Sequence, residues 1–227
     1  MSDSFTAYDA KWAGKVIGLY GGSFNPAHKG HVHISKLALE LLKLDALWWL
    51  VTPGNPLKND KDTASLDERL AHAQNMANDA RIHITDAESK LNTRFSCDSI
   101  RKLQEIHKDS RFIWVMGADN LANFHKWRNW EDIFHMLPIA VFARPGYDKG
   151  VLTSPAAEKF KSSRLEEREA EYLGQRQTPA WIYLNTPLHE ASATALREDA
   201  SGKFEDAARL AKAQDKNALG QQRKDKE

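Results

Sequence analysis

Lys15-Val-Ile-Gly-Leu-Tyr-Gly-Gly-Ser-Phe-Asn-Pro-Ala-His-Lys-Gly-His31 begins with an apolar run and continues into a glycine-rich turn. The apolar run predicts a buried strand followed by a tight turn. From His31 to Leu44, apolar residues recur at the i, i+3, i+4 and i+7 spacing, which predicts an amphipathic helix. A second apolar run, Ala46–Val51, completes a strand–helix–strand unit that is typical of a parallel sheet.

The same alternation continues along the chain. A capping box at Ser65–Glu68 predicts a helix to about Asn78, and Cys97–Lys108 has the spacing of another. Further strands are predicted at residues 81–85, 112–116, 138–143 and 180–184. We therefore predict an α/β fold, a Rossmann-like open parallel sheet with helices on both faces.

The organisation of the chain follows from its composition along the sequence. Residues 1–14 are interpreted as a polar N-terminal extension, residues 15–202 as a single domain, and residues 203–227 as a charged, partly disordered tail. Residues 146–178 are polar and mixed in charge, so we expect an excursion with one exposed helix rather than core.

The composition also limits the partners. The 32 Lys and Arg balance 31 Asp and Glu, which argues against a nucleic-acid-coating protein. The longest apolar stretch, residues 37–51, is too short and too often interrupted by charges to span a membrane. The N-terminus lacks the apolar core of a secretory signal, and one cysteine, Cys97, excludes an intrachain disulfide. We predict a cytoplasmic protein without nucleic-acid or membrane partners; a homo-oligomer is compatible with the sequence, which leaves the oligomeric state open.

Residues 21–31 follow a predicted strand and precede a helix, which is where open α/β sheets bind ligands. Glycines allow close approach of a ligand, and a helix N-terminus attracts anions. His28 and His31 lie three residues apart, so both imidazoles can face one anion. The loop matches neither the dinucleotide fingerprint nor a Walker A loop. Two other interpretations are an ordinary packed histidine pair and a zinc site with His33, which lacks an obvious fourth ligand.

The loop Gly22–His31 resembles the His-x-Gly-His signature of the nucleotidyltransferase superfamily, and the wider pattern is most similar to nicotinate-nucleotide adenylyltransferases. This resemblance implies transfer of the adenylyl group of ATP to nicotinate mononucleotide, giving deamido-NAD and pyrophosphate in NAD biosynthesis. It also implies Mg²⁺ bound with ATP, held by phosphate oxygens and water and by no protein side chain.

The resemblance carries over to residues in four blocks. His28 and His31 match the catalytic phosphate donors, and anionic phosphates are expected to favour their protonated form. The implied ATP-binding residues are Gly21, Gly22, Ser23, Phe24, Gly30, Lys58, Gly117, Asp119, Ser192, Thr194 and Arg197. The implied residues for nicotinate mononucleotide are Asn25, Phe95, Ser96 and Trp127.

Some positions depart from the family pattern. Leu57 stands where the family carries a histidine, and Ala191 and Ala193 replace residues of the family's Ile-Ser-Ser-Thr block, which removes one hydroxyl contact. Structural roles compete with the functional ones. Lys58 is also interpreted as a solvated loop lysine and Trp127 as core packing, and helix capping is the alternative for Ser96, Asp119, Ser192 and Thr194.

Other functions remain open at this point. A related adenylyl- or cytidylyltransferase would use nicotinamide mononucleotide, phosphopantetheine or a sugar alcohol phosphate as acceptor. A non-catalytic nucleotide sensor would keep the site but not need the two histidines. An RNA-binding module is disfavoured by the charge balance and by the lack of an aromatic and basic stripe.

Overall fold

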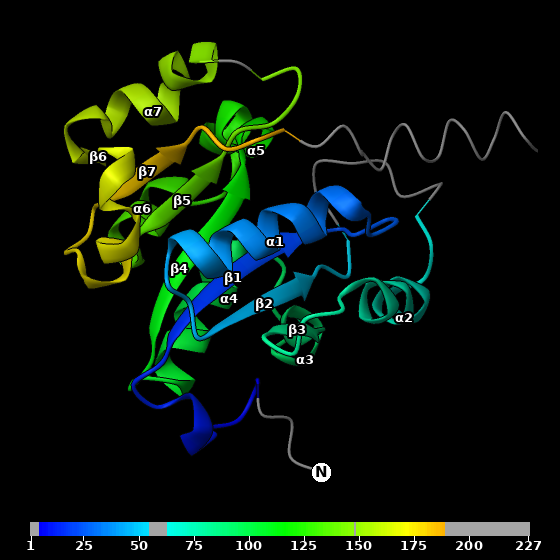
Figure 1. Ribbon diagram of the computed structural model, residues 1–227. Coiled ribbons are helices and arrows are strands. Elements are labelled where there is room, and N and C mark those ends of the chain that lie inside the picture. The colour runs from blue at the N-terminus through cyan, green and yellow to red at the C-terminus, as the bar shows by residue number, and fades with distance from the viewer. Residues whose placement is uncertain (1–4, 55–62, 148, 189–227) are drawn as a thin grey trace, which may run out of the picture. The chain divides into compact units, whose positions relative to one another are not determined.

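Seven parallel strands form the central sheet of the computed structural model, which describes residues 5–54, 63–147 and 149–188. The strand order is β3-β2-β1-β4-β5-β7-β6, as Figure 1 shows. The strands are β1 (Val16–Gly22), β2 (Ala46–Val51), β3 (Ile82–Thr85), β4 (Arg111–Gly117), β5 (Ile139–Phe142), β6 (Arg164–Leu165) and β7 (Trp181–Leu184). The prediction of a Rossmann-like open parallel sheet is confirmed.

Helices connect the strands. The α-helices are α1 (Lys29–Leu41), α2 (Leu66–Met76), α3 (Ala87–Lys90), α4 (Ser96–Ile106), α5 (Ala118–Asn123), α6 (Trp130–Met136) and α7 (Pro155–Lys159). Short 3-10 segments are η1 (Ala10–Trp12), η3 (Phe124–Lys126), η4 (Lys149–Thr153), η5 (Lys161–Ser163) and η6 (Glu167–Gln175). The long predicted helices lie within three residues of their expected ends, whereas the short ones after residues 86 and 129 were not predicted.

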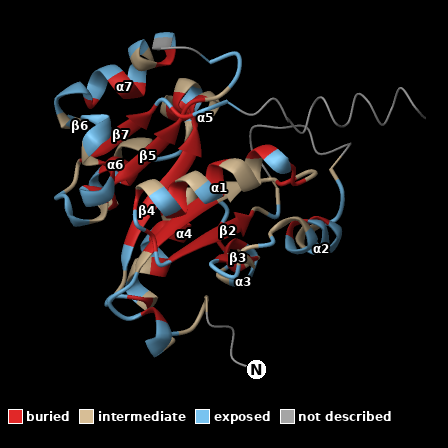
Figure 2. Ribbon diagram, viewed as in Figure 1, coloured by how far each residue is buried: buried red, intermediate tan, exposed pale blue. Residues whose placement is uncertain are grey.

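The sheet is buried on both faces. Alternate residues of each strand point to opposite sides, and helices pack against each side. In β2, Trp48 joins the cluster that contains α4 and α6, while its neighbour Trp49 joins the cluster that contains α1. Figure 2 shows the resulting pattern, in which the strands are buried and the helices expose their outer sides. The continuous apolar run in β2 therefore reflects two cores.

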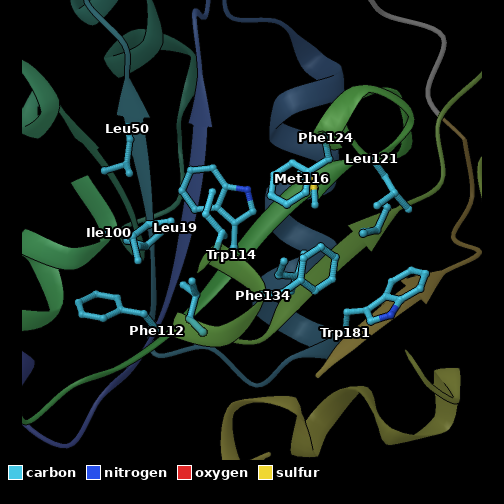
Figure 3. Packing of buried hydrophobic residues seen from close by; sticks show 14 of the residues in the cluster. Leu19, Leu50, Ile100, Phe112, Trp114, Met116, Leu121, Phe124, Phe134 and Trp181 are labelled. Carbon is cyan, nitrogen blue, oxygen red and sulfur yellow. The ribbon is translucent and has the colours of Figure 1, made fainter. Parts of the chain in front are cut away.

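The face that carries α4 and α6 holds many large aromatic side chains. Figure 3 shows Trp114 of β4 next to Leu19 of β1, its partner in the sheet, with Phe134 of α6 and Trp181 of β7 in the same cluster. The Phe134 ring stacks on Phe160, with centroids 4.0 Å apart and planes 9° apart. This packing holds β4 on one face of the sheet. Its neighbour in the sheet is β1, which carries the glycine-rich loop.

The expectation that residues 146–178 lie outside the core was wrong in part. The segment supplies an edge strand, β6, and several buried apolar side chains: Val151, Ala156, Ala157, Phe160, Ala170 and Leu173. These residues are spaced along short helical turns, so the charged residues between them face solvent while the apolar ones reach the sheet.

The N-terminal extension also contributes aromatic packing. Phe5 contacts Trp48 edge-on at 4.9 Å between centroids, and Trp12 contacts the same indole at 5.1 Å. The described part of residues 1–14 is therefore more than a polar extension. Every described residue belongs to one compact unit. The expected domain end at residue 202 and the tail lie outside the described residues and stay predictions.

The strand order reverses between β1 and β4. The chain passes from β1 to β2 and β3 on one side, then returns to place β4 on the other side of β1. Ligands in open α/β sheets bind beyond the carboxyl ends of the strands at such a point. Gly22 and Gly117 are the last residues of these two neighbouring strands. In the described part of the chain, no helix is long and apolar enough to cross a membrane.

Candidate active site

The glycine-rich loop begins at the carboxyl end of β1, as the sequence predicts. A Cβ atom on Gly21 would lie 2.7 Å from the Trp114 ring, and one on Gly22 would lie 3.3 Å from the Phe24 ring. Real Cβ atoms do not approach ring carbons as closely as the first of these distances. Packing alone therefore requires glycine at position 21, whatever ligand binds there.

Phe24, in the turn of this loop, has an unusual backbone conformation. Its φ of 45° lies in the left-handed region, which costs a non-glycine residue on the order of 1–3 kcal/mol. Its ring is buried and stacks on Trp49, with centroids 4.7 Å and planes 10° apart, and meets Tyr20 edge-on at 5.8 Å. These aromatic contacts stabilise the loop in this strained conformation.

The two histidines of the motif lie against each other at the start of α1. His28 is the residue before the helix, His31 is in the first turn, and the centroids of the two rings are 3.7 Å apart. The backbone N–H of His28 donates to Nδ1 of His31 at 3.1 Å. Because Nδ1 accepts this bond, a neutral His31 carries its proton on Nε2. The structure thus gives His31 a defined tautomer with a donor N–H at Nε2.

Burial lowers the pKa of His31 well below 6.5, and the nearby His28 and Arg144 lower it further. His31 is therefore neutral at pH 7 in the protein alone. The expectation of a protonated imidazole thus depends entirely on the charge of bound phosphates. A neutral imidazole still donates one hydrogen bond, so the absence of a formal charge does not remove its use at a phosphate.

The described residues do not support the zinc interpretation. No group of three His, Cys, Asp or Glu side chains that could hold a metal occurs within residues 5–54, 63–147 and 149–188. His33 Nε2 lies 2.7 Å from the carbonyl oxygen of Pro187. The His33 imidazole thus pairs with the main chain of Pro187, just after β7.

The carboxyl end of β4 contributes a carboxylate. Asp119 lies in the first turn of α5, whose N-cap is Gly117, so the capping role considered for Asp119 is wrong. Its Oδ2 accepts a hydrogen bond from Arg144 Nη1 at 2.7 Å. Its Oδ1 is buried and accepts no hydrogen bond from the part of the chain that the structure describes. A buried acceptor without a donor costs roughly 1–3 kcal/mol, which a ligand hydroxyl would recover.

Sequence reasoning missed Arg144 as a site residue. It lies two residues after the end of β5, the strand that pairs with the one ending in Gly117, and its charge acts on both His31 and Asp119. The one signal in the sequence was its position immediately after a predicted strand. That signal places Arg144 at the carboxyl end of a strand, but it does not say which residue Arg144 contacts. The ion pair with Asp119 is therefore visible only in the structure.

Three of the four residues expected to bind nicotinate mononucleotide, Phe95, Ser96 and Trp127, lie on two neighbouring segments. Phe95 is the N-cap of α4 and Ser96 its first residue, so the capping role considered for Ser96 is wrong. Phe95 has no side-chain acceptor, and the first amides of a helix have no partner within it. The Arg128 guanidinium lies 4.7 Å from the centre of the Phe95 ring, which joins α4 to the segment that carries Trp127.

Trp127 is half-buried. Its ring lies 4.9 Å from Phe124 and meets Trp114 edge-on at 6.2 Å between centroids. Trp114 is the same side chain that packs beneath Gly21. The structure therefore links the Trp127 segment to the glycine-rich loop through one indole. Core packing and ligand contact are both compatible with a ring that is only partly covered.

The remaining predicted residues divide into two groups. Ser23 and Gly30 lie in the loop and in the first turn of α1, and Asn25 Oδ1 accepts a hydrogen bond from the Ala64 amide at 3.1 Å. Asn25 therefore has a part in holding the loop. The other group lies outside the described residues: Lys58, Ser192, Thr194 and Arg197.

Comparison with known proteins shows which family this chain belongs to. A Cytidylyltransferase-like family model matches residues 19–199. A protein named "Probable nicotinate-nucleotide adenylyltransferase" from Methylorubrum extorquens (strain PA1) is 49% identical over 181 residues, covering 80% of this chain and 98% of that protein. The chain belongs to the nicotinate-nucleotide adenylyltransferase family.

Other members of the family agree. The protein of the same name from Brucella suis biovar 1 is 46% identical over 183 residues, covering 81% of this chain and 94% of that protein. Among solved structures, a Plasmodium falciparum nicotinic acid mononucleotide adenylyltransferase complexed with NaAD has a TM-score of 0.61 and 19% identity, covering 81% of this chain and 83% of that one. At this identity the structural likeness supports the fold of the family.

Proposed function

We propose that this chain transfers the adenylyl group of ATP to nicotinate mononucleotide, giving deamido-NAD and pyrophosphate as a step of NAD biosynthesis. Membership of the family gives the reaction class, nucleotidyl transfer. The observation that carries the proposal for this chain is the His28–His31 pair at the N-terminus of α1. A helix N-terminus with two imidazoles at a topological switch point is suited to bind a chain of phosphates.

The proposed reaction is an in-line displacement at the α-phosphorus of ATP. An oxygen of the acceptor's 5′-phosphate forms the new P–O bond, and the oxygen that bridges the α- and β-phosphates leaves with the electron pair as part of pyrophosphate. No side chain needs to act as nucleophile, because such transfers depend mainly on positioning and charge stabilisation. His31 would donate from Nε2, and His28 from its adjacent ring, to phosphate oxygens on which negative charge increases.

The other substrate groups match the remaining residues of the site. The buried Oδ1 of Asp119 would accept a hydrogen bond from a ribose hydroxyl of ATP, with Arg144 holding the carboxylate in place. The indole of Trp127 would stack on the electron-poor pyridinium ring. The first amides of α4, after Phe95, would bind the nicotinate carboxylate beside Ser96.

Magnesium belongs to this proposal as part of the substrate Mg²⁺–ATP. Apart from the Asp119 carboxylate, whose Oδ2 accepts a hydrogen bond from Arg144, the described groups that face the switch point are imidazoles, amides and an arginine. These groups donate to anions, whereas Mg²⁺ prefers oxygen ligands. Bound to the phosphates, the ion would neutralise part of the charge of the leaving pyrophosphate. Lys58, Ser192, Thr194 and Arg197 stay predicted phosphate ligands. Cytoplasmic location, the lack of nucleic-acid partners and the oligomeric state also stay untested expectations.

The test measures pyrophosphate release from Mg²⁺–ATP with nicotinate mononucleotide and, separately, with its nicotinamide analogue. His31→Ala should lower kcat by about 10²–10³-fold, the usual cost of removing one preorganised donor. His33→Ala, on the same helix, is the matched control and should keep the wild-type rate.

Each outcome decides a separate part. Near-normal turnover in His31→Ala would remove His31 from the mechanism. Equal rates with both acceptors would keep adenylyl transfer and refute the carboxylate site at α4. Absence of release with either acceptor, despite ATP binding, would refute the proposed function and favour a nucleotide sensor.

A further inference from the structure

Arg69 of α2 is almost completely buried, with 2% of its surface exposed. Its guanidinium donates four hydrogen bonds to main-chain carbonyl oxygens. Nη1 donates to Ser23 and to Thr52, each at 2.7 Å. Nη2 donates to Pro53 at 3.1 Å, and Nε donates to Ala64 at 3.0 Å. One side chain thus connects the loop after β1, the loop after β2 and the segment before α2.

The geometry of these bonds requires arginine. A buried charge needs hydrogen-bond partners, and bonds from a charged donor are stronger than neutral ones. The guanidinium is a rigid fork whose three nitrogens reach carbonyls in different directions. Lysine carries the same charge on a single nitrogen, so it cannot reach all four carbonyls from one position. The role of Arg69 therefore depends on its shape as well as on its charge.

The bond to Ser23 connects Arg69 with the two histidines. Ser23 directly precedes Phe24, whose left-handed backbone persists only where its surroundings fix it. The Phe24 ring lies 4.8 Å from the His31 ring between centroids. A second link, from the Thr52 amide to the Gly22 carbonyl at 3.0 Å, holds the same loop to the end of β2. Arg69 thus reaches His31 through Ser23 and Phe24.

We propose that Arg69 is a positioning residue, which fixes the β1–α1 loop in the conformation that packs Phe24 against His31. The catalytic part of this inference rests on the proposed function. Arg69 does not itself touch the reacting atoms. Its loss would displace the loop and with it the imidazole, and a misplacement of about 1 Å can cost ~10²-fold in rate.

The test compares Arg69→Lys with the wild-type protein in two measurements. The first is kcat for pyrophosphate release at saturating Mg²⁺–ATP and nicotinate mononucleotide, with KM for each substrate. The second is the set of His31 imidazole resonances in nitrogen–proton NMR spectra of the protein without nucleotide. We expect kcat to fall by roughly 10–100-fold, with little change in KM for the acceptor, and the His31 resonances to shift.

Trp181→Phe is the matched control. Trp181 of β7 donates from Nε1 to the carbonyl of Phe160, the C-cap of α7, at 2.8 Å, which is a buried bond from a side chain to the main chain. This variant loses the same kind of bond without contacting the β1–α1 loop. It should lower the free energy of unfolding while keeping kcat and the His31 resonances. If Arg69 only stabilised the fold, Arg69→Lys and Trp181→Phe would have the same kcat and the same His31 resonances once their free energies of unfolding are matched.

The outcomes separate this inference from the proposed function. Unchanged His31 resonances in a folded Arg69→Lys variant would overturn the inference whatever the rate. Shifted resonances with an unchanged kcat would overturn its catalytic part. If the wild-type protein releases no pyrophosphate, the proposed function fails, and the resonances alone decide whether Arg69 positions His31.

Discussion

Glu88 offers a test of the energetics around α4. It lies in α3 with 5% of its surface exposed, and its Oε1 accepts a hydrogen bond from the Ser99 hydroxyl at 3.3 Å. Ser99 Oγ lies 2.8 Å from Thr93 Oγ1 and also contacts the Phe95 carbonyl, the N-cap of α4. Burial raises the pKa of Glu88 from 4.5 to about 7, although the Ser99 bond opposes the shift.

The sign of the pH effect follows from this direction. The folded protein holds the proton of Glu88 more tightly than the unfolded chain, so the carboxyl favours folding most at low pH. This favourable term is lost as the pH rises from the unfolded pKa through the folded one. Each pKa unit corresponds to about 1.4 kcal/mol, so the full loss is about 3 kcal/mol, most of it between pH 5 and pH 7.

Glu88→Gln removes the titration and keeps the shape of the side chain. We expect the difference in unfolding free energy, wild type minus variant, to fall by roughly 2–3 kcal/mol between pH 5 and pH 8. Urea denaturation at a series of pH values measures this difference. Glu105→Gln, at an exposed position on α4, is the matched control for replacing a glutamate carboxyl with an amide. Parallel pH profiles for the wild-type protein and Glu88→Gln would refute the reasoning.

Two further substitutions test packing and acceptor binding. Phe160→Ala removes the ring that stacks on Phe134 and should lower the free energy of unfolding by about 3 kcal/mol, measured by urea denaturation; a loss well below 1 kcal/mol would contradict the assignment of this segment to the core. Trp127→Ala should raise KM for nicotinate mononucleotide about tenfold and leave KM for ATP unchanged, because stacking on a pyridinium is worth about 1–2 kcal/mol; an equal change in both values would indicate a structural role alone.

The sheet was predictable because its strands are apolar on both faces. Ala46–Val51 is recognisable as a strand without tertiary information because every residue of it is apolar, as a strand covered on both faces requires, and all of them are buried in the fold. Phe160 and Leu173 were not predicted to be core, because charged residues surround them in the sequence. Their burial depends on which side of a short helical turn meets the sheet, and that is decided by partners such as Phe134, distant in the sequence.

In the candidate site too, residues in a local motif were predicted and residues with distant partners were not. His28 and His31 were identified because both lie in one local motif that follows a strand. Arg144 and Arg69 were not, since their partners Asp119 and Ser23 are 25 and 46 residues away along the chain. A local pattern identifies groups that face a ligand together. It does not identify a side chain that holds another segment of the chain in place.

This division has a physical consequence for the site. The two arginines are already engaged before any nucleotide binds, one with the main chain of two loops and one with Asp119. His31 is neutral, with its Nδ1 bonded and its tautomer fixed. The charges of Arg69 and Arg144 thus fix the loops and the carboxylate, and in the proposed reaction imidazole donors of fixed direction would bind the phosphates. Donors that are already oriented need no rearrangement as charge develops, which is the condition under which a hydrogen bond lowers a barrier most.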